Sequence, residues 1–121
     1  MKTLRLEHIL FELESWMRTL IFMEKENTKI KIHLAMITKI STGDELLKKI
    51  EHLHNSLINN DHLLLIMRNF IKKEIDTLKH NANYYTESIK HRQKFRKGML
   101  LIEKQFNEIK EKLLLLSANL F

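Results

Sequence analysis

Apolar residues recur at alternating steps of three and four along nearly the whole chain. From residue 6 to residue 37 the series is interrupted once, by Asn27. This heptad spacing places the apolar residues on one stripe of an α-helix, the a and d positions of a coiled coil. Proline is absent, and only two glycines occur among 121 residues, so little interrupts helix propagation. The sequence therefore predicts an all-α fold with coiled-coil-like packing.

Two short segments supply the main turn signals. STGDE at residues 41–45 offers Gly43 as a left-handed helix stop and Asp44 as the cap of a new helix. HNAN at residues 80–83 is the second turn. Helices of similar length joined by short turns must run antiparallel. We expect residues 1–121 to form a single domain, an antiparallel three-helix bundle with helices at about 4–40, 44–79 and 84–118.

An alternative fold depends on the segment NND. A break near Asn59 to Asp61 would divide the second helix and give a four-helix bundle, because Asp61 is a competent N-cap. The heptad phase, however, continues through this segment without a slip. The continuous helix is therefore the preferred interpretation.

The polar interruptions of the three apolar series meet one another when the helices are aligned about the two turns. This alignment sets Asn27 against Asn60, and Glu74 against Arg92. A buried amide or charge without a partner costs about 1–3 kcal/mol or more, whereas a satisfied pair can fix the register of neighbouring helices. We therefore predict two polar core layers, an Asn27 and Asn60 pair that sets the register and a Glu74 and Arg92 ion pair.

Large apolar residues also occupy b and c positions, which a lone three-helix bundle exposes. Three neighbouring pairs fall at one level near mid-length, and a fourth lies further along the third helix. A belt of such side chains exceeds what a monomer normally leaves in water. It predicts self-association or a partner helix. The belt consists of Ile21, Phe22, Leu65, Ile66, Leu100, Leu101, Leu114 and Leu115.

Positive charge is concentrated around the segment KHRQKFRKG, residues 90–98. Across the three helices at this level nine basic residues stand against four acidic ones, so most of the formal net charge of +6 lies in one third of the rod. Such a concentration attracts phosphate groups or acidic partners. The charges wrap the helix, however, and Phe95 is assigned to the core instead of a stacking role. The basic patch comprises Lys72, Lys73, Lys90, Lys94, Arg96 and Lys97.

Several chemistries lack the residues that they need. Cysteine is absent, which excludes thiolate sites and disulfides, and there is no glycine-rich phosphate loop or nucleophile elbow. His8 and Glu12 stand at i and i+4, but most of the seven histidines fall outside the predicted core, unlike the inward ligands of di-iron bundles. We expect no catalysis, metal or cofactor.

The apolar runs are far shorter than the ~20 residues that span a bilayer. The first residues also lack the pattern of a signal peptide. We therefore expect a cytoplasmic protein with no membrane span.

WMRTLIFMEKEN, residues 16–27, resembles a segment of short coiled-coil proteins of Bacteroidetes type. That resemblance covers part of one helix and implies a helical module without a known activity. The residues themselves favour a non-enzymatic protein that self-associates or docks to another protein. The alternative is a protein that associates with nucleic acid through the basic patch.

Overall fold

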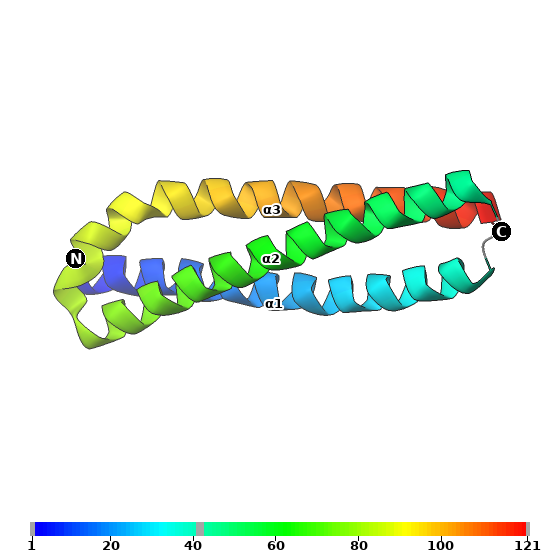
Figure 1. Ribbon diagram of the computed structural model, residues 1–121. Helices are drawn as coiled ribbons and strands as arrows, with labels where there is room; N and C mark the ends of the chain where they lie inside the picture. The colour runs from blue at the N-terminus through cyan, green and yellow to red at the C-terminus, as the bar shows by residue number, and fades with distance from the viewer. Residues whose placement is uncertain (1, 41–42, 121) are drawn as a thin grey trace.

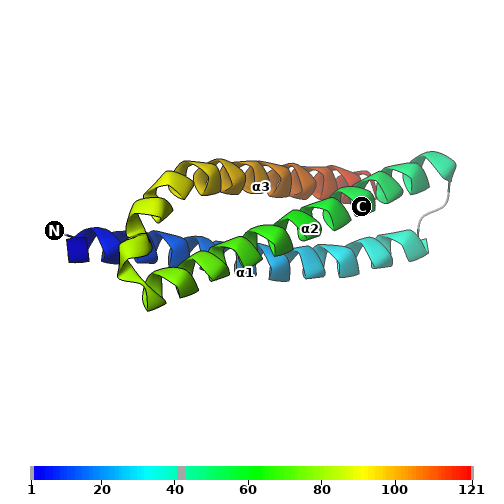
Figure 2. The same ribbon diagram turned by 60° about the vertical axis from the view of Figure 1, so that its left-hand side comes forward.

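Three long helices lie side by side in an elongated bundle (Figure 1). The computed structural model describes the backbone of residues 2–40 and 43–120 and the side chains of residues 5–40 and 43–118. Its elements are α1 (Lys2–Ile40), α2 (Asp44–His80), the short 3-10 helix η1 (Ala82–Tyr84) and α3 (Tyr85–Leu120). α2 runs antiparallel to both neighbours and crosses them obliquely (Figure 2). The predicted all-α three-helix bundle is confirmed, with helix ends within two residues of those expected.

α2 continues without a break through Asn59 to Asp61. The four-helix alternative is therefore wrong. The unbroken heptad phase was the better guide, because the tertiary contacts of a continuous apolar stripe outweigh the turn preference of three polar residues.

The start of α2 differs from the expectation. Gly43, and not Asp44, occupies the N-cap position, with φ of 116° and no side-chain capping bond. Its carbonyl accepts a hydrogen bond from the Leu47 N–H at 3.2 Å. Asp44 is instead the first helical residue, where its carboxylate lies beside the positive end of the helix dipole. Residues 41 and 42 of the predicted turn lie outside the described residues.

The apolar stripes pack into two buried clusters along the bundle. One lies toward the turn between α2 and α3, and the other lies toward the opposite end. The layer of Asn27 and Asn60 falls between them along α1 and α2. The main members of the first cluster are Ile9, Leu13, Leu20, Leu64, Ile71, Met99 and Ile102, and those of the second are Ile30, Leu34, Ile37, Leu53, Leu57 and Ile109.

The predicted asparagine layer is present and is more extensive than the pair alone. Asn27 is 0% exposed and Asn60 is 1% exposed. The Asn27 Nδ2 donates to Asn60 Oδ1 at 2.8 Å and to Asp61 Oδ1 at 3.0 Å, and Lys31 forms an ion pair with Asp61. The Asn60 Nδ2 reaches Gln105 Oε1 at 3.4 Å. The layer therefore links all three helices, and sliding one helix by a heptad would separate these polar groups.

Replacing one member of this layer should cost more than replacing both. We expect Asn27→Leu to lower the free energy of unfolding by about 1–3 kcal/mol, because the buried Asn60 Oδ1 loses its donor. The double variant Asn27→Leu with Asn60→Leu should recover much of this loss, since both polar groups give way to apolar ones. Urea denaturation of wild type, both single variants and the double variant measures the coupling. Simple additivity would contradict the role of the pair.

Candidate interaction surfaces

Glu74 is a buried carboxylate that contacts three polar side chains, one from η1 and two from the first turns of α3. It is 5% exposed. Its Oε1 accepts from the Tyr84 hydroxyl at 2.8 Å, and its Oε2 accepts from the Ser88 hydroxyl at 3.2 Å and lies 3.0 Å from His91 Nδ1. The hydrogen bond to Glu74 raises the pKa of Tyr84, because ionisation would place a second negative charge beside the carboxylate. We call these four residues the Glu74 cluster.

The predicted ion pair of Glu74 with Arg92 is wrong. Arg92 binds Glu12 of α1 instead, with Nε to Oε1 at 2.6 Å and Nη2 to Oε2 at 2.8 Å. The alignment considered only α2 and α3, whereas an a position of α3 also borders α1. The Arg92 side chain is 34% exposed, so it bridges the surface of α1 and α3 and is not a core layer.

This bidentate pair shifts the pKa values of both partners. The hydrogen bond from Arg92 is the main cause that holds the pKa of Glu12 below its ordinary value of 4.5, against the opposing effect of partial burial. The same hydrogen bond raises the pKa of Arg92. Arg96 adds a longer contact to Glu12 at 3.4 Å. Glu12 is thus the anionic junction between α1 and α3.

The Glu12 pair should make stability depend on pH in the acid range. A carboxylate whose pKa is lowered by folding contributes stability above its ordinary pKa of 4.5, and this contribution is lost as the pH falls through the lowered value. We expect Glu12→Gln to reduce the free energy of unfolding at pH 7 by up to about 1 kcal/mol, because water still reaches both groups. Denaturant titrations at several pH values should show the difference from wild type disappearing in acid. Arg92→Gln should remove the same increment, and fully additive effects would argue against the pair.

The predicted apolar belt is exposed almost throughout. Seven of its eight side chains are exposed to solvent, and Ile21 is half-buried. The exposed fractions are 56% for Phe22, 53% for Leu65, 39% for Ile66, 61% for Leu100, 52% for Leu101, 69% for Leu114 and 68% for Leu115. None of these side chains is needed to complete the core of the single chain. The belt is therefore surplus apolar surface.

The belt is divided among the three grooves between the helices. Leu114 lines a hollow with Lys29 and His33 of α1. Leu100 stands two heptads before Leu114, and Phe22 stands one heptad before Lys29. Both residues therefore border the same groove of α1 and α3. Leu115 lines a hollow with His52 of α2.

The same heptad reasoning places the other four belt residues. Leu101 stands two heptads before Leu115, and Ile66 stands two heptads after His52, so both border the groove of α2 and α3. Ala35 and Glu51 line a hollow between α1 and α2. Ile21 and Leu65 occupy the equivalent heptad positions and border that groove. The belt thus presents apolar surface on three faces.

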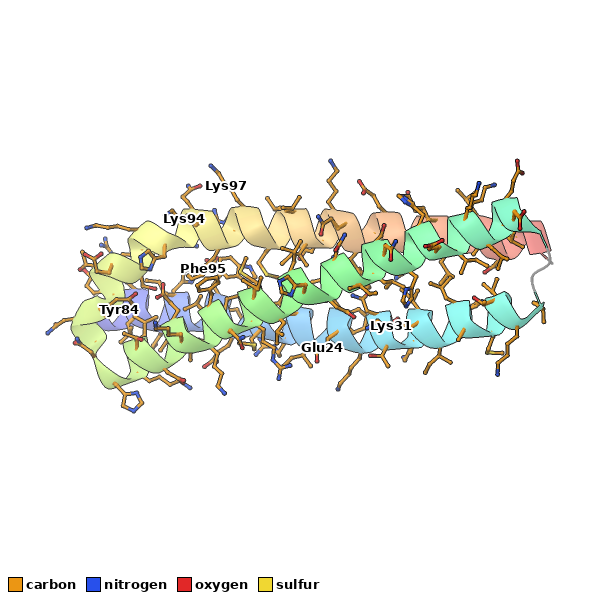
Figure 3. All side chains as sticks on the ribbon, in the orientation of Figure 1. Glu24, Lys31, Tyr84, Lys94, Phe95 and Lys97 are labelled. Atoms are coloured by element: carbon orange, nitrogen blue, oxygen red, sulfur yellow. The ribbon has the colours of Figure 1, made fainter. Side chains whose placement is uncertain are left out.

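The basic patch lies beside the turn between α2 and α3, and all six of its side chains are exposed. Arg96 contacts Glu12, and Lys90 pairs with Glu87 at 3.2 Å. The remaining four, Lys72, Lys73, Lys94 and Lys97, form no ion pair with any residue that the structure describes. Lys94 and Lys97 extend from the outer side of α3, and Phe95 lies toward α2 (Figure 3). Four exposed cations are thus free for a partner.

The histidines do not gather into a ligand set. Across residues 5–40 and 43–118, no group of three or more His, Asp or Glu side chains is placed to hold a metal ion. Of the His8 and Glu12 pair, Glu12 contacts Arg92 and Arg96. His33 and His54 line different hollows, on opposite sides of α1.

Comparison with family models, with curated proteins and with solved structures gives no match for this chain. Among the described residues, no helix combines the length and the apolar character that crossing a bilayer requires. The candidate sites are therefore defined by the geometry and chemistry of this chain alone.

The sequence pattern did not predict the roles of three residues on these surfaces. His91 was placed outside the core by its g position, although a g residue can reach a buried carboxylate at d on the neighbouring helix. The sequence predicts Tyr84 as the first residue of the third helix, but it ends η1, which brings its hydroxyl to Glu74. Phe70 is 58% exposed beside Lys73. The sequence feature that could have predicted this exposure is an aromatic residue at a g position next to a basic segment.

Proposed function

We propose that this protein is a non-enzymatic helical interaction module whose apolar belt associates with a second copy of the chain. The observation that carries this proposal is the exposure of seven belt residues on a bundle whose core is already complete. The groove of α1 and α3 offers the most exposed set, with Phe22 and Leu100 at mid-length and Met36, 63% exposed, with Leu114 further along. Standard dimer interfaces bury roughly 800 Å² per partner. That is about a tenth of the chain's surface of 8466 Å².

Charge distribution supports an antiparallel arrangement of the two copies. α1 has 39 residues and is therefore about 58 Å long. The belt lies near its middle, and the basic patch lies at one end. An antiparallel dimer joined at the belt places the two basic patches on opposite sides of the dimer centre, whereas a parallel dimer would place them at the same level, within the ~10 Å over which surface charges interact at 0.1 M salt. Like-charge repulsion therefore opposes the antiparallel dimer less than the parallel one.

Sedimentation tests this proposal directly. At tens of micromolar the wild type should sediment as a dimer, and Phe22→Ser with Leu100→Ser should sediment as a monomer, because the variant loses apolar area that association would bury. The matched control is Ile58→Ser with Ile89→Ser, which changes two residues outside the belt that are 48% and 42% exposed. This control should remain dimeric. A strictly monomeric wild type would remove self-association.

Nucleic-acid binding through the basic patch is the second candidate function. Its specific support is the absence of ion pairs at Lys72, Lys73, Lys94 and Lys97 among the described residues. If these lysines contact phosphates, binding to a 30-nucleotide oligomer should weaken steeply as salt increases. Substituting all four by Glu should abolish binding. No detectable binding of single-stranded or duplex DNA at low salt would eliminate this candidate.

A further inference from the structure

The three grooves of the bundle differ in how their charges are paired. Ion pairs cross the groove of α1 and α2 at Arg68 with Glu24, Lys31 with Asp61 and Lys79 with Glu14. Glu12 draws Arg92 and Arg96 across the groove of α1 and α3. In the part of the chain that the structure describes, no lysine or arginine pairs with a carboxylate across the groove of α2 and α3. That groove is the one whose cations lack internal partners.

Lysines stand on both sides of this groove and toward both of its ends. Lys73 and Lys94 flank the end near η1, and Lys49 and Lys112 flank the opposite end. All four are exposed, and within the described residues none forms an ion pair. Three glutamates stand at the c positions that border this groove, Glu45 on α2 and Glu87 and Glu108 on α3, and Glu87 pairs with Lys90. The edges are therefore predominantly positive.

The floor of the groove is apolar and contains two hollows. The hollow near η1 has a volume of about 510 Å³ and is lined by Met67, Phe70 and Phe95, together with Glu74, Tyr84 and His91. The second, of about 470 Å³, is lined by Leu53, Leu115 and Leu116. Ile66 and Leu101 of the belt lie between them. From His52 to Phe70 there are 18 residues, so the hollows are about 27 Å apart along α2.

We propose that the groove of α2 and α3 binds an acidic amphipathic helix of about 18 to 20 residues as a fourth helix. Its apolar stripe packs on Ile66 and Leu101 and fills the hollow at each end. Glutamate or aspartate side chains on either side of that stripe pair with Lys73 and Lys94 at one end and with Lys49 and Lys112 at the other. This site shares Ile66 and Leu101 with the belt but lies in a different groove from Phe22 and Leu100, and the inference does not rest on self-association.

The arrangement favours a helix over the other anionic partners. A nucleic-acid backbone gains from rows of cations, but it gains little from an aliphatic floor, and the Glu74 carboxylate near that floor opposes phosphate groups. A flat lipid surface does not enter a groove between two helices. A second copy of this chain would bring lysines toward lysines. Only an apolar stripe with acidic margins matches both the floor and the edges.

The test uses a fluorescein-labelled 20-residue peptide with leucines at heptad spacing and glutamates on both flanks. Fluorescence anisotropy should give saturable binding to the wild type. Lys73→Glu with Lys94→Glu should weaken it by about tenfold or more, because two attractive contacts become repulsive. Lys39→Glu with Lys104→Glu makes the same change in net charge at exposed lysines outside the groove. This control should stay within about twofold of wild type.

A second variant tests the shape of the groove without changing its charge. Gly98 allows Met67 to lie against α3, since a Cβ at Gly98 would come within 2.1 Å of the Met67 Cε. Gly98→Ala should displace the end of the Met67 side chain into the hollow and weaken peptide binding. The circular dichroism spectrum should remain that of a helical protein, because alanine favours helix. A peptide with lysine in place of glutamate should not bind.

Three results would overturn the proposal. The first is no binding of the acidic peptide to the wild type, and the second is equal weakening by both double-lysine variants. The third is binding of a 30-nucleotide oligomer or of phosphatidylglycerol vesicles that is tighter than peptide binding and is lost in Lys73→Glu with Lys94→Glu. The Phe22→Ser, Leu100→Ser variant should still bind the peptide. Loss of peptide binding and loss of self-association can therefore be distinguished.

Discussion

The requirement that buried polar groups find partners fixes how these three helices align. Heptad stripes of leucine and isoleucine pack almost equally well when one helix slides by seven residues, because one aliphatic layer resembles the next. Asn27 and Asn60 remove that freedom. The Asn27 Nδ2 donates to Asn60 and to Asp61, and the Asn60 Nδ2 reaches Gln105, and these contacts can form only in one register. Every surface feature then follows, since the register decides which exposed residues share a level.

The sequence was sufficient to predict the fold and the asparagine layer. Both depend on patterns within one helix or between two neighbours, namely heptad spacing and the meeting of polar interruptions. It failed for Glu74 and Arg92, where a third helix supplies the better partner. A pairwise alignment cannot rank Glu12 against Glu74, because that choice depends on how the three helices are arranged about the bundle axis.

The same limitation applies to the surfaces. Position b or c is enough to predict that Phe22 or Leu101 is exposed, and the structure confirms this. It is not enough to say which groove the residue borders. The third helix of a bundle can pack on either side of the first two, and the same apolar stripes are buried in both arrangements. The ion pairs that join e positions of α1 and α2 identify the arrangement that this chain adopts. Only then do the lysines of α2 and α3 fall on one face.

The Glu74 cluster has a consequence for ligand entry at the η1 end of that face. Tyr84, Ser88 and His91 all contact one carboxylate on α2, so the wall of the hollow is braced before any ligand arrives. A receptor held in this way loses little conformational entropy when it is occupied, and more of the contact energy remains as affinity. The acidic residue that interrupts the core stripe thus holds together one end of the site where we propose that an acidic helix binds.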